Sequence, residues 1–296
     1  MSPPSQPAAG PVGRWVLGAR PRTLPASAVP VVVGSAVAGA AGHFVWWRAL
    51  LAVVVALALQ VATNYANDYS DGVKGTDEVR VGPLRLVASG LAPPAAVKRA
   101  AIVAFAVAGA AGLLLAAIAG WWLIGVGVAC MAAGWLYTGG PRPYGYAGLG
   151  EVFVFVFFGV VATVGTAFVQ MGRIDGLAVT AAIPVGLLAV ALLIVNNLRD
   201  IPGDTGAGKR TLAVRLGAPA TRIAYAACLG AALLFAVAVA TDRTYAVLAL
   251  AAAPVAVVPV RKVLGGATGQ ALIPVLGETG RAQLVFGALL ALGIAL

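Results

Sequence analysis

The chain has 296 residues, of which 61% are hydrophobic and 10% are charged, and its formal net charge is +10. So little polar surface cannot cover a water-soluble domain, which excludes a soluble fold. The basic residues are spread over short loops between apolar stretches, which argues against a nucleic-acid-binding protein. Cys130 and Cys228 lie within apolar stretches and have no ligand-spaced partner, so we interpret them as packing residues.

The chain begins with a Pro-, Gly- and Ala-rich stretch that lacks the pattern of a cleaved signal peptide, so we expect a disordered tail over residues 1–13. Residues 14–296 are predicted to form one transmembrane domain. Apolar stretches of about 20 residues, enough to cross a bilayer as a helix, recur through it. This pattern predicts an all-α bundle in the lipid bilayer, with nine spans at residues 24–42, 46–66, 96–119, 121–138, 149–170, 178–198, 220–240, 244–260 and 280–296.

The basic residues indicate the orientation of these spans. If the amino terminus is cytoplasmic, 17 of the 20 Lys and Arg residues lie on the cytoplasmic side, and Arg48, Arg173 and Arg243 lie outside. Cytoplasmic loops of membrane proteins carry an excess of Lys and Arg, so this orientation is favoured over its inverse. An odd number of spans then places the carboxyl terminus outside a bacterial-type cytoplasmic membrane.

Acidic residues are scarce, yet several gather just after the second predicted span. The chain there contains Asn64, Asn67, Asp68, Asp71, Lys74 and Asp77. A spacing of four residues places Asn67 and Asp71 on one helix face, and it relates Asn64 to Asp68 in the same way.

A second acidic cluster follows the sixth predicted span. Asn196 and Asp200 repeat the spacing of four, and they lie 129 residues after the corresponding pair of the first cluster. Pro202 and Gly203 are expected to end the helix and leave Asp204 on a loop. The shared offset predicts an internal repeat, with two four-helix units followed by one further helix.

Carboxylates at the carboxyl end of a helix repel one another and face the negative end of the helix dipole, so such clusters require cations. Magnesium prefers oxygen ligands, and it usually takes one or two carboxylates together with water and phosphate. We therefore predict bound Mg2+ that bridges to a diphosphate. The candidate ligands are Asp68, Asp71, Asp77, Asn196, Asp200 and Asp204.

Basic residues share the two acidic segments, namely Lys74, Arg80, Arg85, Lys209 and Arg210. Their side chains can bind diphosphate oxygens and offset the negative charge of a departing diphosphate. Arg85 and Lys209 are the stronger candidates. The alternative is a pair of hydrated loops whose charges merely neutralise each other, but the duplicated spacing and location argue against it.

The two clusters resemble the Asn-x-x-x-Asp-x-x-x-Asp motifs of the UbiA superfamily of intramembrane prenyltransferases. Asn196, Asp200 and Asp204 match in full, whereas the first motif has glycine at position 75 and its next acid at Asp77, as in the 1,4-dihydroxy-2-naphthoate branch. Segments 82–90 and 137–151 resemble further signatures of the family and of this branch. The resemblance implies a bundle around a central cavity, with the motifs at its cytoplasmic mouth and a lateral opening for the isoprenoid.

The resemblance also implies the reaction and its participants. A polyprenyl group would pass from polyprenyl diphosphate to 1,4-dihydroxy-2-naphthoate, with loss of diphosphate and CO2, giving demethylmenaquinol for menaquinone biosynthesis. The candidate catalytic residues are Asp71, Asp200, Lys209, Arg142, Tyr137 and Glu151. The candidate substrate-binding residues are Asn67, Lys74, Arg80, Arg85, Asn196, Arg210, Tyr65 and Tyr69.

Five of these residues have individual expected roles. Arg142 would pair with the acceptor carboxylate or the diphosphate, although it also fits as a topology-setting charge, and Glu151 would position an acceptor hydroxyl. Tyr65, Tyr69 and Tyr137 are candidates to face an allylic cation, and plain packing is an equal alternative for each.

Two other functions fit parts of the pattern. One is prenyl transfer to another acceptor, such as 4-hydroxybenzoate, a chlorin, haem or a sugar phosphate. The other is a secondary transporter, since repeats and polar groups at broken helices also occur in that class. The polar clusters lie at one membrane face rather than at the midplane, which favours an enzyme.

Overall fold

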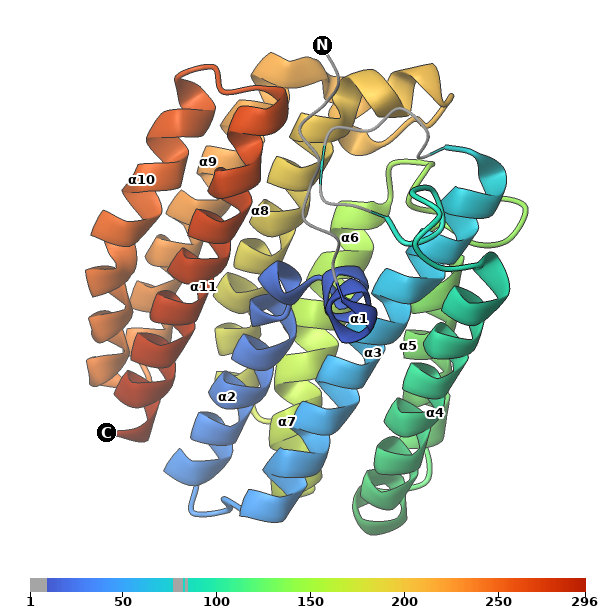
Figure 1. Ribbon diagram of the computed structural model, residues 1–296. Helices are drawn as coiled ribbons and strands as arrows, with labels where there is room; N and C mark the ends of the chain where they lie inside the picture. Colours follow the sequence, from blue (N-terminus) through green and yellow to red (C-terminus); the bar gives the residue numbers. More distant parts are fainter. Residues whose placement is uncertain (1–9, 77–81, 83–84) are drawn as a thin grey trace.

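The fold is a bundle of membrane-spanning helices, given by a computed structural model that describes residues 10–76, 82 and 85–296 (Figure 1). Within these residues the regular elements are all helical. They are α1 (Pro11–Ala19), η1 (Pro21–Thr23), α2 (Pro25–Ala40), α3 (Trp46–Lys74), α4 (Pro94–Ala119), α5 (Leu123–Leu136), α6 (Gly150–Val154), η2 (Phe155–Val161), α7 (Ala162–Met171), α8 (Gly176–Gly206), α9 (Leu212–Ala240), η3 (Thr244–Ala252), α10 (Ala253–Leu264), η4 (Gly269–Ala271) and α11 (Leu272–Ala295).

The prediction of an all-α membrane bundle is confirmed, while the count of nine spans is approximate. In the described part of the chain, seven helical segments are long and apolar enough to cross a membrane. The segments Val12–Thr23 and Pro25–Ala40 are bent by 55° and make an eighth if they count as one span, and Leu123–Leu136 is a shorter apolar helix. Helix α1 begins at Pro11, inside the range expected to be a tail.

Helix α8 lies at the centre of the bundle and is the most enclosed span. Of its most apolar stretch 72% is buried, against 28–56% in the other six segments. Small residues allow close packing here, as usual between helices in lipid. A Cβ atom added to Gly159 of η2 would lie 2.6 Å from the Cα atom of Gly186 of α8.

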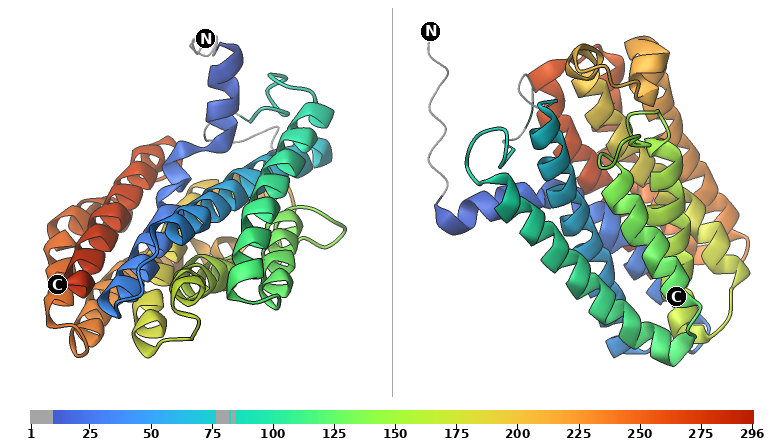
Figure 2. Two further views of the ribbon diagram at one scale, coloured as in Figure 1. Left: turned by 90° about the horizontal axis from the view of Figure 1, so that it is seen from below. Right: turned by 90° about the vertical axis from the view of Figure 1, so that its right-hand side faces the viewer.

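The loops that follow α3, α5 and α8 lie at one end of the bundle, the upper end in Figure 1, and the carboxyl terminus lies at the other end. Figure 2 shows that α4 and α5 flank α3 on one side, whereas α9, α10 and α11 lie on the far side. Helices α3 and α8 both run past their predicted ends at residues 66 and 198. Their last turns therefore carry the two acidic clusters to the same end of the bundle.

Candidate active site

The first acidic cluster occupies the last two turns of α3. Asn67 and Asp71 are both buried, and their spacing of four places them on one face. The Thr138 hydroxyl donates to Asn67 Oδ1 at 2.9 Å. Lys74 Nζ donates to the carbonyls of Thr138 and Gly140 at 2.7 and 3.1 Å. This end of α3 is thus fixed against the loop that follows α5.

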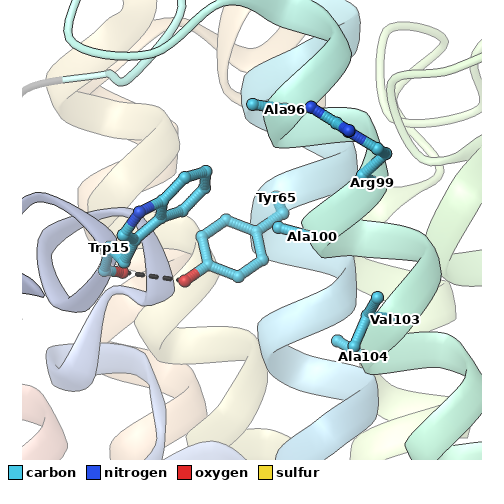
Figure 3. Close-up of a pocket in the computed structure, with 7 residues that line it drawn as sticks. All are labelled: Trp15, Tyr65, Ala96, Arg99, Ala100, Val103 and Ala104. Atoms are coloured by element: carbon cyan, nitrogen blue, oxygen red, sulfur yellow. Dashed lines mark hydrogen bonds between the residues drawn. The ribbon is translucent and has the colours of Figure 1, made fainter.

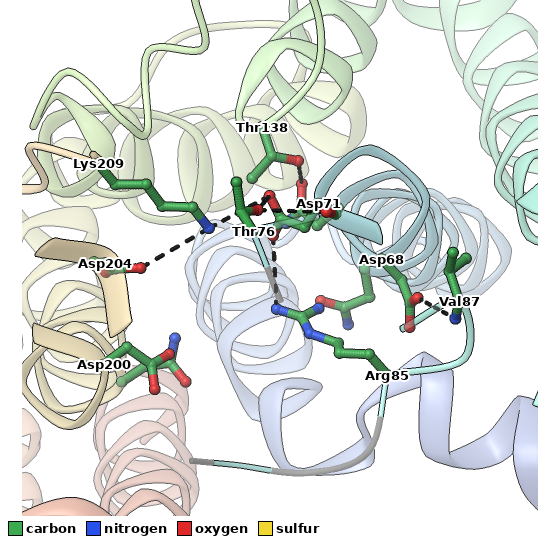
Figure 4. Close-up of polar contacts among 12 residues, drawn as sticks. Asp68, Asp71, Thr76, Arg85, Val87, Thr138, Asp200, Asp204 and Lys209 are labelled. Atoms are coloured by element: carbon green, nitrogen blue, oxygen red, sulfur yellow. Dashed lines mark hydrogen bonds and ion pairs between the residues drawn. The ribbon is translucent and has the colours of Figure 1, made fainter. Parts of the chain in front are cut away.

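Asp71 is a buried carboxylate that lies near two basic side chains, Arg85 and Lys209 (Figure 4). Its Oδ1 accepts a hydrogen bond from the Tyr146 hydroxyl and lies 3.5 Å from Lys209 Nζ. Its Oδ2 lies 3.9 Å from Arg85 Nη2. The structure therefore brings together Asp71 and the two basic residues that the sequence singled out, with the Asp71 side chain only 4% exposed.

The second cluster lies on one continuous helix, so the expectation that Pro202 and Gly203 end it is wrong. Helix α8 continues to Gly206 and includes Asp204. Proline removes one backbone donor, and Pro202 is exposed near the end of α8, where water can bind the freed carbonyl. Asn196, Asp200 and Asp204 follow one another at intervals of four, so they form a stripe along one side of α8.

Arg199 belongs to the site, although the sequence suggested for it only a role in topology. Its Nε and Nη2 bind Asp200 Oδ1 and Oδ2 at 2.7 and 2.8 Å, and Nη2 also donates to Asn196 Oδ1 at 2.8 Å. This bidentate pair is buried, with the Arg199 residue 3% exposed. A Cβ atom on Gly82 would lie 3.3 Å from Arg199 Cζ, so Gly82 lies next to this pair. In the sequence, only the position of Arg199 directly before Asp200 could have indicated that it belongs to the site.

Lys209 joins the two acidic clusters. Its Nζ lies 3.5 Å from Asp71 Oδ1 and 3.8 Å from Asp204 Oδ1, as Figure 4 shows. The Lys209 side chain is 8% exposed, so its charge acts where water screens little. The two helix ends therefore converge, as the repeated motif predicts.

The donor set at this place fits a magnesium ion. Among the described residues no three acidic, histidine or cysteine side chains lie close enough to bind one ion together. Magnesium does not require such a group, since it commonly takes one or two carboxylates and completes its shell with water and phosphate. Asp71 and Asp204, which share Lys209, supply two carboxylates of this kind.

The carboxylate of Asp68 binds backbone N–H groups of the segment after Arg85. Its Oδ2 accepts the backbone N–H of Leu86 at 2.8 Å, and its Oδ1 accepts that of Val87 at 3.0 Å. The residue is fully buried. Asp68 thus anchors the segment that directly follows Arg85 and so fixes the position of the Arg85 backbone.

We expect Asp68→Ala to lower the unfolding temperature of the purified protein by several degrees, because a buried and a partly buried backbone donor lose a charged acceptor, at a cost of about 1–3 kcal/mol for a buried one. Asp68→Asn keeps one acceptor oxygen and should have an intermediate effect. Thermal unfolding in detergent measures both. Equal unfolding temperatures for the wild type and the alanine variant would contradict this anchoring role.

Tyr65 and Tyr69 contact Trp15 and Trp135 rather than Asn67 or Asp71, and their expected role facing the reacting centre stays a prediction. The Tyr65 hydroxyl donates to the Trp15 carbonyl at 2.8 Å, and the residue lines an open pocket between α1 and α4 (Figure 3). The Tyr69 ring packs against Trp135, with ring centres 6.2 Å apart, and Lys98 Nζ lies 5.6 Å from it. A shift of two residues turns a side chain about 200° around a helix, away from the motif face.

Tyr137 and Glu151 lie together beside α8. A Cβ atom on Gly150 would approach the Tyr137 hydroxyl to 3.4 Å. Glu151 Oε1 accepts from Asn197 Nδ2 at 2.9 Å, and its buried Oε2 has no hydrogen-bond partner among the described residues. An acceptor oxygen is therefore available in this buried corner.

The remaining candidates lie at the surface or beyond the described ranges. The side chains of Arg142 and Arg210 are exposed. Asp77 and Arg80 fall outside the described residues. The backbone N–H of Arg210 donates to the Tyr146 carbonyl at 2.9 Å, which joins the loop after α8 to the loop after α5. Tyr146 was given no role by the sequence, and only its place in the 137–151 signature pointed to it.

Known proteins match this chain in sequence and in fold. The profile of the UbiA prenyltransferase family matches residues 27–273, and the chain therefore belongs to this family. It is 51% identical to 1,4-dihydroxy-2-naphthoate octaprenyltransferase of Mycobacterium tuberculosis over 92% of this chain and 94% of that protein. It is 39% identical to the Escherichia coli protein of the same name over 95% of this chain and 94% of that protein.

A solved structure agrees with the fold. The UbiA homologue from Archaeoglobus fulgidus bound to DMAPP and Mg2+ matches with a TM-score of 0.67, covering 95% of this chain and 98% of that one. The sequence identity is 14%, so this likeness concerns the fold. The multi-pass membrane bundle is thus the fold of the family.

Proposed function

We propose that the protein transfers a polyprenyl group from polyprenyl diphosphate to 1,4-dihydroxy-2-naphthoate in menaquinone biosynthesis. The observation that carries this proposal is the meeting of both acidic motifs at Lys209. Relatives that are 39–51% identical over most of the chain carry the name of this activity. Their similarity supports the naphthoate acceptor over the other acceptors.

Lys209 and Arg85 are the groups that hold the diphosphate. They approach the two oxygens of Asp71 from different elements, and both side chains are 8% exposed. Positive charges held in place in a poorly hydrated site stabilise charge that develops on a leaving group. As the allylic C–O bond breaks, its electron pair passes to the diphosphate, whose added charge these two side chains stabilise. Lys74 positions the neighbouring loop through Thr138 and Gly140.

Asp71, Asp200, Asp204 and Asn196 are the residues that would hold Mg2+. Their oxygen donors suit a hard cation. The archaeal homologue bound to DMAPP and Mg2+ supports the use of a divalent metal in this fold. When bound, the metal draws electron density from the diphosphate and so helps it to leave. Asp77 is also proposed as a ligand, on the ground of the sequence motif alone.

The acceptor is assigned to the side of the site near Glu151. Its Oε2, which has no hydrogen-bond partner within the described part of the chain, can accept a hydrogen bond from a naphthol hydroxyl. The Tyr137 ring and the apolar wall around it exclude water, which would otherwise quench the allylic cation. Arg142, at the exposed loop, can pair with the acceptor carboxylate as it enters.

The bond changes balance without an additional reagent. The ring carbon that carries the carboxylate attacks the allylic carbon, and a C–C bond forms. The bond to the carboxylate then breaks, CO2 leaves, and its electron pair restores the aromatic ring. The products of this reaction are demethylmenaquinol, CO2 and diphosphate; demethylmenaquinone forms from the quinol only in a separate two-electron oxidation.

We further propose that the amino terminus and the loops of the site face the cytoplasm of a bacterial-type inner membrane. The 17 basic residues on that side support this orientation. Site-directed labelling of single cysteines placed at residues 90 and 242, which lie at opposite ends of the bundle, tests it. Labelling of residue 90 from the outside of intact cells would contradict the orientation.

The reaction is tested with purified protein, a polyprenyl diphosphate, Mg2+ and a panel of acceptors. We expect equal amounts of diphosphate and CO2 to be released with 1,4-dihydroxy-2-naphthoate, and a prenylated product of the corresponding mass. Diphosphate release with 4-hydroxybenzoate but not with the naphthoate would show that the protein uses another acceptor. Substrate flux across sealed vesicles without diphosphate release would support a transporter.

A further inference from the structure

Tyr146 connects the parts of the site that come from different helices. Its hydroxyl donates to Asp71 Oδ1 and lies 3.4 Å from Thr76 Oγ1, both at the end of α3. Its backbone carbonyl accepts the N–H of Arg210, the residue after Lys209. One tyrosine on the α5–α6 loop thus contacts the first acidic motif and the loop that follows the second.

The ring of Tyr146 also faces two ammonium groups. Lys209 Nζ lies 4.6 Å from the ring centre and Lys74 Nζ lies 5.2 Å from it. An ammonium group within about 6 Å of an aromatic face is attracted to it, more strongly where water is scarce. The ring therefore favours the positions from which Lys209 reaches Asp71 and Lys74 reaches the Thr138 carbonyl.

We propose that Tyr146 is a positioning residue with two separable functions, a hydroxyl that aims the Asp71 carboxylate and a ring that holds the Lys209 ammonium group. The hydrogen bond at Oδ1 fixes the rotation of the carboxylate, so Oδ2 points toward Arg85. The ring holds the Lys209 ammonium group, the positive charge to which we assign binding of the diphosphate. This inference rests on the proposed function for the roles of Asp71 and Lys209.

The two functions predict different results for two substitutions. Tyr146→Phe removes the hydroxyl and keeps the ring, so it should weaken the Asp71 side of the site alone. Tyr146→Leu removes both and should weaken the lysine side as well. A hydrogen bond to a charged group is strong enough to change an equilibrium constant by about tenfold or more.

Tyr144 provides a matched control two residues away. Its hydroxyl donates to the Ala133 carbonyl at 2.8 Å and its ring stacks on Phe153 at 3.9 Å. Burial raises the pKa of the Tyr144 phenol, so this residue stays a neutral donor at ordinary pH. Among the described residues the Tyr144 hydroxyl is hydrogen-bonded to Ala133 and not to Asp71 or Lys209. Tyr144→Phe therefore removes the same atom from the same loop, away from the acidic motifs.

Two measurements separate the functions. In the first, Mg2+ is titrated in the presence of inorganic pyrophosphate while the unfolding temperature is recorded. The Mg2+ concentration at the midpoint of the rise in unfolding temperature is the result, and this measurement needs no turnover. The second is steady-state kinetics, which gives KM for the polyprenyl diphosphate and kcat. For Tyr146→Phe we expect the Mg2+ midpoint to rise about tenfold while KM stays within about twofold of the wild type. Tyr146→Leu should raise both, and Tyr144→Phe neither.

A Mg2+ midpoint for Tyr146→Phe equal to that of the wild type would overturn the role of the hydroxyl. Equal KM values for the two Tyr146 variants would overturn the role of the ring. If the wild type shows no turnover with the naphthoate, the proposed function fails, while the order of the Mg2+ midpoints still decides the role of the hydroxyl.

Discussion

Asp71→Asn is expected to reduce kcat/KM by about 100- to 1000-fold, the loss typical for one electrostatic group aimed at a reacting centre. The substitution removes a negative charge and keeps the size of the side chain. The amide oxygen still accepts a hydrogen bond from the Tyr146 hydroxyl, so the loop contact survives. What is lost is the charged oxygen that we assign to the metal. Diphosphate release, measured with saturating naphthoate, gives the size of the effect.

Asp242→Asn makes the same chemical change at the opposite end of the bundle, where Asp242 is exposed after α9. This variant should retain wild-type turnover. Both variants should insert into the membrane and elute as folded protein, because asparagine keeps the size of the side chain and, at position 71, the hydrogen bond from Tyr146. Wild-type turnover by Asp71→Asn would remove this carboxylate from the reaction.

Lys209→Met is expected to reduce kcat by about 100-fold or more and to raise KM for the polyprenyl diphosphate, since the side chain contributes a buried charge to the leaving group. Methionine keeps much of the length of lysine and removes the ammonium group. In the substrate-free protein the change also leaves Asp71 and Asp204 without the cation they share. The unfolding temperature without Mg2+ should therefore fall, and added Mg2+ should restore part of the loss.

Lys262→Met is the matched control, because Lys262 also pairs with an acid, Glu278, at the end of the bundle that carries the site. Its side chain is 46% exposed, and surface pairs of this kind contribute about 0–1 kcal/mol. Turnover should remain at the wild-type level. If both methionine variants lose activity equally, the loss does not come from the position of Lys209.

The location of the site was predictable from the sequence because its signal is strong and duplicated. Two Asn and Asp pairs at a spacing of four, offset by 129 residues, each follow an apolar span. Odd and even spans run in opposite directions, so the ends of the second and sixth spans must lie at the same membrane face. The structure adds that Lys209 lies between the two clusters at this face.

The direction of individual side chains was harder to predict. Tyr65 and Tyr69 lie close to Asn67 and Asp71 in the sequence, but the helix turns them toward Trp15 and Trp135. The helical period contains this information, whereas adjacency in the sequence does not.

The partners of the acidic residues could not be predicted from spacing. Crowded carboxylates at helix ends require positive charge, which the sequence analysis assigned to metal ions. The structure also supplies arginine and lysine, with Arg199 bound to Asp200 and Lys209 between Asp71 and Asp204. Which basic residue reaches which acid depends on loop paths that local sequence does not encode.

The pairing of these acids with arginine and lysine has a practical consequence for handling the protein. Proteins whose folded state depends on a metal lose that state when the ion is stripped away. Here the negative charges have internal counter-charges, so extraction and chromatography in buffers that contain EDTA should leave the chain folded. Returning the ion by dialysis should then suffice to regain function, without a refolding step.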